Sequence, residues 1–406
     1  MKILLINQVF VAPDEPGHTR HFELAKYLQS QGDEMVIVAS DLNYQTGKPT
    51  TKQKGLVVEQ FINGVKVLRT HMPAVIHRSY FWRIIAFFSF MFNSVIASLK
   101  VKEEDLVMGT TPPIFQAFSA WLVSALKRKP FLLEVRDLWP EFIVSMGVFR
   151  NPLLIWLARR LEIFLYKRAR HILVNSPAYL EYIHAKGIPE SKITFIPYGA
   201  DGVAFHPSNN GSQVRDEFNL RDKFVVLYCG ALGQANDFAT AIRAASHLQN
   251  DDWIRLLVVG DGKERSNLEK QATDLNLSNV IFAGTRPKHQ IPQYVAAADV
   301  SLAILQNVPM FRTTYPNKVF DNMAAGKATI LVIDGVIRQC IETCQGGVFV
   351  PPGDDRKLAE TIRELAGSPE KLSEMGANAR RYLMENLERT MMMEKTRALL
   401  LSLRKP

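Results

Sequence analysis

Residues 225–233 read Val-Val-Leu-Tyr-Cys-Gly-Ala-Leu-Gly, and this stretch decides the fold class. Its apolar, β-branched start is typical of a strand buried on both faces, and Gly230 and Gly233 then open a loop before a helical segment. Glycines at such a turn let backbone N–H groups approach a phosphate, but tight strand-to-helix turns also need glycine for geometry alone. Both interpretations stay open at this point.

The same succession of a short apolar run and a helical stretch recurs along the whole chain. Strands that alternate with helical segments of ten or more residues predict parallel sheets with right-handed crossovers. The predicted fold class is α/β, with two Rossmann-like domains of the same kind that face each other across a cleft. The remaining strands are expected at residues 3–6, 35–39, 65–69, 105–108, 131–135, 171–174, 193–196, 254–259, 280–282, 300–305 and 328–333.

A chain of 406 residues is too long for one core, so two domains are expected. A polar break at residues 207–212 lies just past the midpoint. We predict an N-terminal domain over residues 1–198, a C-terminal domain over 199–384, and a helix at about 385–406 that packs back on the first domain. No Gly-x-Gly-x-x-Gly follows the first strand, which weakens a dinucleotide-cofactor interpretation.

Charge and cysteine usage restrict the setting. The chain begins with a strand-like run and no separate apolar signal region, and its three cysteines make a disulfide framework unlikely, so a cytoplasmic protein is expected. Residues 1–197 hold 24 Lys and Arg against 16 Asp and Glu, whereas the remainder holds 25 against 24. The first half therefore faces an anionic partner, either a phospholipid surface or nucleic acid, or carries ordinary solubilising charge.

A helical segment at residues 81–99 favours a membrane as the anionic partner. Apolar residues at 81, 84, 85, 88, 91, 92, 95, 96 and 99 form a one-sided stripe, which we interpret as the core side. Trp82, Phe87 and Phe90 lie outside this stripe, beside Arg83 and after His77-Arg78. We predict that these residues contact the anionic inner face of the cytoplasmic membrane. The alternative is an ordinary core helix. Residues 152–170 add five basic residues around a second apolar stripe.

The most informative loop is residues 314–327, Thr-Tyr-Pro-Asn-Lys-Val-Phe-Asp-Asn-Met-Ala-Ala-Gly-Lys. Pro316 suits a helix start, which leaves the amides of Asn317, Lys318 and Val319 at the positive end of the helix dipole. A diphosphate fits there, Lys318 adds a full charge, and Asp321 can accept hydrogen bonds from ribose hydroxyls. The loops at Gly262 and at Thr285-Arg286 also follow strands, and the second has a backbone edge that can pair with a nucleobase.

These motifs together resemble the retaining family-4 glycosyltransferases of the GT-B fold, over essentially the whole chain. The resemblance is closest to the subgroup that builds O-antigens, capsules and exopolysaccharides on polyprenyl diphosphate, which includes N-acetylfucosamine transferases. The matching stretches are Pro-Gly-His-Thr-Arg-His-Phe-Glu-Leu-Ala at 16–25, Gln-Gly-Asp-Glu-Met-Val at 31–36, Glu-Val-Arg-Asp-Leu-Trp-Pro-Glu at 134–141, Ile-Pro-Tyr-Gly-Ala-Asp at 196–201, Gly-Asp-Gly at 260–262, and Pro-Asn-Lys at 316–318 through Ala-Ala-Gly at 324–326.

The resemblance implies Gly17 near the donor diphosphate, the main chain around Arg286 at the nucleobase, the 317–319 amides with Lys318 on the phosphates, and Asp321 on the ribose. Two departures change the site. Thr313 stands where relatives often carry the first of two acids, and residues 231–238 lack the usual arginine and lysine. Phosphate neutralisation must then come largely from Lys318 and the helix N-terminus, with Arg312 or Arg136 as further candidates.

The acceptor side is expected in the first domain. Asp137 can orient the acceptor hydroxyl or take its proton and Arg136 can hold a phosphate, although a buried Arg–Asp pair that fixes the loop is the alternative. Glu141 is a second candidate base. Three further residues, His18, Arg20 and Trp139, are predicted to contact the acceptor.

The predicted reaction transfers a sugar from a nucleotide sugar, with uridine diphosphate as the expected nucleotide, to a lipid-linked or glycan acceptor. The chain contains no Asp-x-Asp, so a metal-independent site without a cofactor is expected. The resemblance implies retention of configuration by same-face attack. A nucleotide-sugar 2-epimerase and a non-catalytic nucleotide-sugar-binding membrane protein stay open. Nucleic acid is disfavoured because the aromatic residues form helical stripes. The sugar and the oligomeric state are not predicted.

Overall fold

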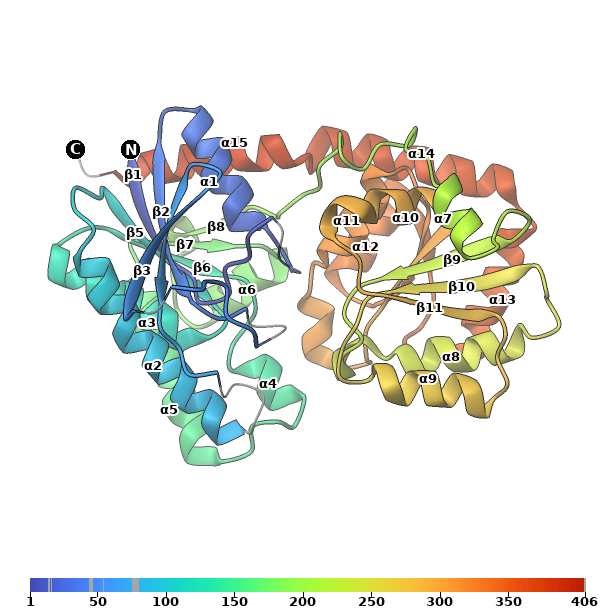
Figure 1. Cartoon of the computed structure of the whole chain (residues 1–406), viewed down its shortest axis with the longest axis horizontal. Coiled ribbons are helices and arrows are strands. Elements are labelled where there is room, and N and C mark those ends of the chain that lie inside the picture. Colours follow the sequence, from blue (N-terminus) through green and yellow to red (C-terminus); the bar gives the residue numbers. More distant parts are fainter. Residues whose placement is uncertain (14, 16, 44–46, 54, 75–79, 405–406) are drawn as a thin grey trace. The chain divides into compact units, whose positions relative to one another are not determined.

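The computed structural model describes residues 1–13, 15, 17–43, 47–53, 55–74 and 80–404. Pro16, His77 and Arg78, which entered the sequence argument, lie outside these residues, as do the last two of the predicted C-terminal helix. The chain divides into two compact units (Figure 1): unit 1 comprises Met1–Pro197 with Met393–Pro406, and unit 2 comprises Tyr198–Met392.

Unit 1 is built on an eight-stranded sheet with the order β3-β4-β2-β1-β5-β6-β7-β8. All neighbouring strands are parallel except the pair β3 and β4. The chain runs outward from β1 on one side and from β5 on the other, so the strand order reverses between these two. The strands are β1 (Lys2–Ile6), β2 (Glu34–Ser40), β3 (Val57–Ile62), β4 (Val65–Thr70), β5 (Leu106–Thr111), β6 (Phe131–Val135), β7 (His171–Val174) and β8 (Ile193–Phe195).

Helices cover this sheet. Among them α2 packs on α3, and α3 packs on α5, so these three lie together on one side (Figure 1). The helices of unit 1 are α1 (Arg20–Ser30), α2 (Tyr80–Leu99), α3 (Ile114–Lys127), α4 (Glu141–Ser145), α5 (Pro152–Arg168), α6 (Pro177–Ala185) and the short 3-10 helix η1 (Glu190–Lys192).

Unit 2 holds a six-stranded parallel sheet with the order β11-β10-β9-β12-β13-β14. The strands are β9 (Phe224–Cys229), β10 (Ile254–Val259), β11 (Val280–Gly284), β12 (Val300–Ile304), β13 (Thr329–Val332) and β14 (Gly347–Phe349). The helices are α7 (Ser212–Glu217), η2 (Gln234–Asn236), α8 (Phe238–His247), α9 (Arg265–Asp274), η3 (Lys288–Gln290), α10 (Ile291–Ala297), η4 (Pro309–Thr313), α11 (Asn317–Ala324), α12 (Val336–Cys344), α13 (Asp355–Ala366) and α14 (Pro369–Asn386). The last helix, α15 (Arg389–Ser402), begins in unit 2 and enters unit 1 at Met393.

The apolar runs form strands because both faces of each sheet are covered. Along β9, Val225 and Leu227 enter one core cluster with α11, whereas Val226 and Tyr228 enter the opposite cluster with α8. Successive side chains of a strand point to opposite faces, so a strand covered on both sides must be apolar throughout. The predicted α/β fold with two parallel-sheet domains is confirmed.

Two edge strands were missed by the sequence analysis. The antiparallel strand β3 pairs with β4 through a two-residue turn at Asn63 and Gly64, whose φ angles are +47° and +85°. Asn-Gly is the preferred sequence of such a hairpin turn, so this signal was present. The other, β14, is only three residues long and carries no periodic pattern.

The C-terminal helical stretch is two helices rather than one. At the break between α14 and α15, Glu388 pairs with Ala200 as an isolated bridge. Gly199, with φ +62°, makes this approach possible, because a Cβ on it would lie 2.0 Å from the Leu387 carbonyl oxygen. Further along α15, in unit 1, Arg397 donates to Asp33 at 2.7 Å.

The face that α2 buries is the reverse of the prediction. The side packed on α3, β2 and β4 includes Ala86, Phe90, Ser94 and Ala97, all fully buried, whereas the described members of the predicted core stripe are exposed (88, 92, 96 and 99) or half-buried (84, 85, 91 and 95). Small side chains let α3 approach closely, and the Ser119 hydroxyl of α3 donates to a backbone carbonyl of α2 at 2.9 Å. The prediction that Phe90 lies at the surface was therefore wrong, and a variant that removes its side chain would damage the core.

The other predicted membrane contacts differ in exposure. Trp82 is exposed, whereas Arg83 and Phe87 are half-buried, with the Phe87 ring 6.2 Å from that of Phe115. Within the described residues, one helical segment, Trp82–Leu99, is long and apolar enough to cross a membrane when judged by length and composition alone. Its packing on α3 and on strands β1, β2 and β4 makes it part of unit 1.

Candidate active site

The strand order of the unit 2 sheet reverses between β9 and β12. In open parallel sheets the loops after two such strands run to opposite sides and leave a crevice at the carboxyl ends. The loop after β9 begins at Gly230, and the chain after β12 passes through η4 into α11. The two stretches that the sequence analysis selected therefore meet at this reversal.

The glycines there are required by close packing. A Cβ on Gly230 would lie 2.6 Å from Lys318 Nζ, and one on Gly260 would lie 1.8 Å from the Gly230 carbonyl oxygen. A Cβ on Gly262 would lie 2.3 Å from the Leu232 carbonyl oxygen. Gly233 is different, since the nearest atom is 3.9 Å away. The sequence left open whether such glycines serve phosphate binding or turn geometry alone. Gly230, Gly260 and Gly262 let the loop after β9 approach both Lys318 and the loop after β10, so close packing accounts for these three.

Lys318 stands in the first turn of α11 with its ammonium held over the loop after β9. Its Nζ donates to the Tyr228 hydroxyl at 3.2 Å and to Asn236 Oδ1 at 3.5 Å, and it lies 4.4 Å from the Tyr228 ring centroid. No carboxylate among the described residues pairs with it. Burial lowers the pKa of Lys318 to about 8. A cation without a counter-charge at a helix N-terminus is an arrangement that favours an anionic ligand.

Other predicted donor residues of unit 2 have partners. Asp321 faces Arg389 at 3.9 Å, Arg312 is exposed and pairs with Asp334 at 3.6 Å, and the Thr313 hydroxyl donates to a backbone carbonyl. The Arg286 side chain is bound to Glu217 at 2.8 Å and to the Tyr294 hydroxyl, so a contact of this residue with a nucleobase is left to its main chain. Asn317 and Val319 flank Lys318 in α11, and Thr285 follows β11.

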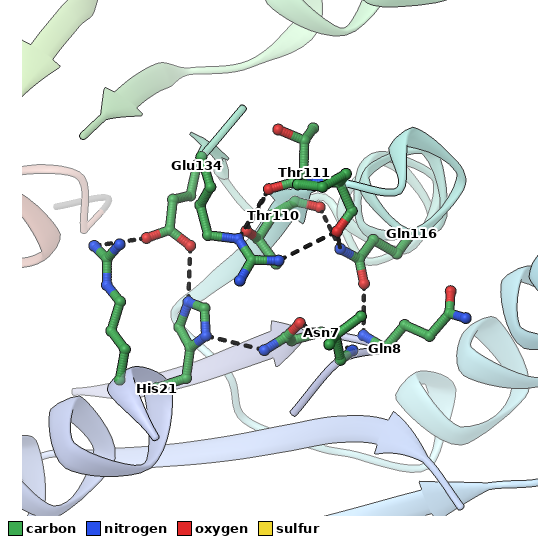
Figure 2. Close-up of polar contacts among 11 residues, drawn as sticks. Asn7, Gln8, His21, Thr110, Thr111, Gln116 and Glu134 are labelled. Carbon is green, nitrogen blue, oxygen red and sulfur yellow. Dashed lines mark hydrogen bonds and ion pairs between the residues drawn. The ribbon is translucent and has the colours of Figure 1, made fainter. Parts of the chain in front are cut away.

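The sheet of unit 1 reverses between β1 and β5, and polar side chains gather after β1, β5 and β6 (Figure 2). Gln116 at the start of α3 donates to the carbonyls of Thr110 and Pro112 at 2.7 and 2.9 Å and accepts from the Gln8 amide. Arg136 donates to the carbonyls of Thr111 and Pro112 at 2.8 and 3.2 Å. These bonds clamp the loop after β5 to its neighbours.

A buried ion-pair network lies beside this clamp (Figure 2). Glu134, at the end of β6, pairs with Arg20 at 2.8 Å and with His21 Nε2 at 2.7 Å, while His21 Nδ1 is 2.9 Å from the Asn7 amide nitrogen. Burial opposes the charge of Glu134, but Arg20, His21 and Arg136 together hold its pKa well below its usual range. Burial lowers the pKa of His21.

Asp137 is the predicted base that the geometry leaves available. The Thr111 hydroxyl and the Trp139 amide bond to its backbone carbonyl, whereas no side chain in the described part of the chain bonds to its carboxylate. Arg136 turns its guanidinium to the loop carbonyls, so the alternative of an Arg–Asp hydrogen-bonded pair is not formed. Burial raises the pKa of Asp137 to about 6 against the opposing charge of Arg136. A carboxylate with such a pKa is suited to accept a proton near neutral pH.

Glu141 has a different role from the one predicted. Both of its carboxylate oxygens accept from Arg159, at 2.7 and 3.0 Å, which ties α4 to α5. A base engaged in this way is occupied by a structural ion pair, so the candidate base in unit 1 is Asp137.

The remaining predicted residues of unit 1 lie around the loop after β1 and the loop after β6. His18 is exposed, Arg20 binds Glu134, and the Trp139 ring is 6.1 Å from that of Phe115. Gly17 has a φ of +133°, a conformation that favours glycine.

Sequence reasoning missed His21, Glu134 and Gln116 as site residues. A signal existed for Glu134, because it is the one charged residue in the apolar strand Phe131–Val135. A charge in a buried strand needs a partner, and the partners come from the helix after β1. Within the described ranges there is no group of three or more His, Cys, Asp and Glu side chains that could hold a metal ion.

Comparison with known proteins identifies the activity class. Residues 17–199 match the "Glycosyl transferase 4-like domain" and residues 212–382 match "Glycosyl transferases group 1", so the two matches account for both halves of the chain. The chain is a glycosyltransferase of the GT-B fold. The predicted enzyme class is thereby confirmed.

Two relatives of this glycosyltransferase cover most of its length. The probable glycosyltransferase WbjE of Pseudomonas aeruginosa is 25% identical over 76% of this chain and 77% of its own. The putative colanic acid biosynthesis glycosyl transferase WcaI of Escherichia coli (strain K12) is 21% identical over 90% and 92%. The crystal structure of Anabaena Alr3699/HepE with UDP-glucose superimposes with a TM-score of 0.74 at 19% identity, over 99% of this chain and all of that one.

Proposed function

We propose that this glycosyltransferase transfers a sugar from a UDP-sugar to a polyprenyl diphosphate-linked or polysaccharide acceptor in surface-polysaccharide biosynthesis. The observation that carries the donor half is Lys318. Its ammonium is buried at the N-terminus of α11, opposite Gly230, and has no carboxylate partner within the described residues. A donor diphosphate supplies the missing counter-charge. The similar fold of HepE, whose structure contains UDP-glucose, supports uridine as the base.

The proposed mechanism needs no metal. As the glycosidic bond breaks, negative charge develops on the leaving diphosphate, and stabilising that charge lowers the barrier most. Lys318 and the amides of the first turn of α11 supply this stabilisation. The chain has no Asp-x-Asp to hold the donor through a cation. The acceptor hydroxyl attacks the anomeric carbon from the same face from which the leaving group departs, so the anomeric configuration is retained. The departing phosphate helps to remove the hydroxyl proton.

Asp137 orients the acceptor hydroxyl or accepts its proton in this proposal. Its carboxylate is half-buried and has no hydrogen-bond partner among the described residues, and its pKa of about 6 leaves it ionised at neutral pH. The Glu134 network and the Gln116 clamp keep the loops after β1, β5 and β6 in register around it.

The acceptor class rests on the relatives and on charge. WcaI is named for colanic acid biosynthesis, and the sequence resembles the subgroup that works on polyprenyl diphosphate, including N-acetylfucosamine transferases. The basic excess of residues 1–197 supports a peripheral position on the inner face of the cytoplasmic membrane, where such an acceptor is presented.

A thermal-shift panel of uridine, guanosine, adenosine and thymidine diphosphates tests the donor, because a ligand that binds only the folded state raises its melting temperature. UDP should give the largest rise. Labelled UDP-sugars with and without a lipid-linked acceptor then test transfer. A larger shift with another nucleotide overturns the choice of base. Epimer formation without acceptor indicates an epimerase, and binding without turnover a non-catalytic protein.

A further inference from the structure

Unit 1 exposes a large apolar surface on three helices, which we call the apolar platform. Half of the 18 large apolar side chains that are exposed in the described chain lie on it. Phe92 and Leu153 are 64% and 63% exposed, although both lie within helices. The platform consists of Phe88, Phe92, Ile96 and Leu99 of α2, Leu126 of α3, and Leu153, Leu154, Trp156 and Leu157 of α5.

The platform is continuous across its helices because aromatic rings bridge them. The Phe88 ring of α2 lies 4.9 Å from that of Phe115 in α3, and the Trp121 ring of α3 lies 4.7 Å from that of Phe164 in α5. All three helices lie on the same side of the sheet (Figure 1). Exposed apolar patches on a soluble protein are typical of protein–protein or membrane interaction sites.

Charge on the three helices selects the partner. They contain a single acidic residue, Glu162, which is 1% exposed and pairs with Lys186. Two exposed arginines of α5 stack on aromatic rings: Arg160 lies 5.3 Å from the Trp156 ring centroid, and Arg168 lies 5.4 Å from that of Phe164. Apolar bodies with cations beside them and no exposed acid match the boundary between the acyl chains and the anionic headgroups of a phospholipid bilayer.

We propose that the apolar platform lies on an anionic phospholipid bilayer, with the side chains of α2 and α5 inserted to the level of the headgroups. A second copy of this chain fits less well, since a two-fold interface would place the same arginines against one another. The inference deepens the proposed function by naming the surface and the lipid charge through which the enzyme reaches a lipid-linked acceptor. Phe88, Phe92 and Ile96 replace the predicted contacts Phe87 and Phe90.

Vesicle flotation without substrate tests the proposal, with phosphatidylcholine vesicles and with vesicles containing phosphatidylglycerol. Wild type should float with the anionic vesicles and much less with the neutral ones. The variant Phe88→Ser, Phe92→Ser, Ile96→Ser should lose at least tenfold in partitioning. Phe61→Ser is the matched control, because Phe61 is 66% exposed but lies on the edge strand β3, and it should float like wild type.

A second variant guards against misfolding of the first. Arg160→Gln with Arg168→Gln changes exposed residues only, and it should weaken anionic binding at low salt and make it less dependent on salt concentration. Equal flotation of the wild type and both variants would overturn the platform assignment. So would a dimer in solution that the serine variant abolishes without changing flotation. The UDP-induced thermal shift, measured on the same samples, reports the proposed donor function separately.

Discussion

Replacing Lys318 by methionine separates the stability of unit 2 from its ability to bind a donor. Methionine keeps the length of the side chain and removes the charge. The ammonium of Lys318 costs folding free energy because it is charged at pH 7 in a desolvated place, with no acidic partner in the described part of the chain. The same charge is what attracts a diphosphate. The substitution should therefore raise the stability of the free protein and weaken its binding of UDP.

The size of the gain follows from the pKa. Each unit by which burial lowers a pKa corresponds to about 1.4 kcal/mol, so the fall from 10.5 to about 8 places the cost of the buried charge near 3 kcal/mol at pH 7. Methionine also loses the contacts with Tyr228 and Asn236, worth about 1 kcal/mol each at most. The expected net gain is about 1 to 3 kcal/mol, or about 2–12 °C in the melting temperature of a domain of this size.

The gain in stability from Lys318→Met should change with pH in a direction that other effects of the substitution do not share. Because the folded-state pKa lies below that of the unfolded chain, the unfolded state binds more protons between pH 8 and 10.5, and the wild type gains stability as the pH rises through this window. The advantage of Lys318→Met should be full at pH 7, smaller at pH 9 and absent above about pH 10.5.

Urea unfolding across that pH range measures the advantage, and a UDP thermal shift measures binding, which should weaken at least tenfold. Three results would refute the reasoning: a variant less stable than wild type at pH 7, a gain that is the same at pH 7 and pH 10, or an undiminished UDP shift.

Three further predictions follow from the site. Asp137→Asn should lower turnover at least about 100-fold while the UDP-induced thermal shift stays unchanged. In the wild type, kcat/KM should fall as the pH drops through about 6, because Asp137 must be ionised to accept a proton. A wild-type rate that is level from pH 5 to 8 would remove Asp137 from the mechanism. Activity should survive EDTA, and a loss restored by magnesium or manganese would contradict the metal-free proposal. Gly260→Ala should cost about 2 kcal/mol or more in urea unfolding, since its Cβ would meet the Gly230 carbonyl. Gly233→Ala, whose Cβ would have only an ordinary contact with Asn236 at 3.9 Å, should cost less than about 1 kcal/mol. Equal costs would show that the close loop packing is wrong.

Much of the fold follows from local patterns. Apolar runs bounded by glycine or helical segments specify parallel strands covered on both faces, because a side-chain period of two leaves no room for polar residues there. Pro316, Asn317 and Lys318 also mark a helix start with a cation beside free amides, which is a local property. The strand order that places β12 beside β9, and so brings Lys318 to Gly230, is instead a property of the tertiary structure.

The tertiary structure decided which face of α2 is buried. This helix carries apolar residues on almost every side, so periodicity alone offers two candidate faces. The choice falls to the side with Ala86, Ser94 and Ala97, because only small residues allow α3 to come close enough to pack. Larger side chains such as Phe92 are left outside, on the apolar platform.

The chemistry of the acceptor side was also decided by distant contacts. Arg136 lies next to Asp137 in the chain but bonds to carbonyls 25 and 24 residues away, whereas Glu141 is taken up by Arg159, 18 residues further on. Which carboxylate keeps a free oxygen and a raised pKa depends on burial and on these partners. Both are properties of the folded chain, because desolvation and the fields of neighbouring charges exist only once the elements have packed.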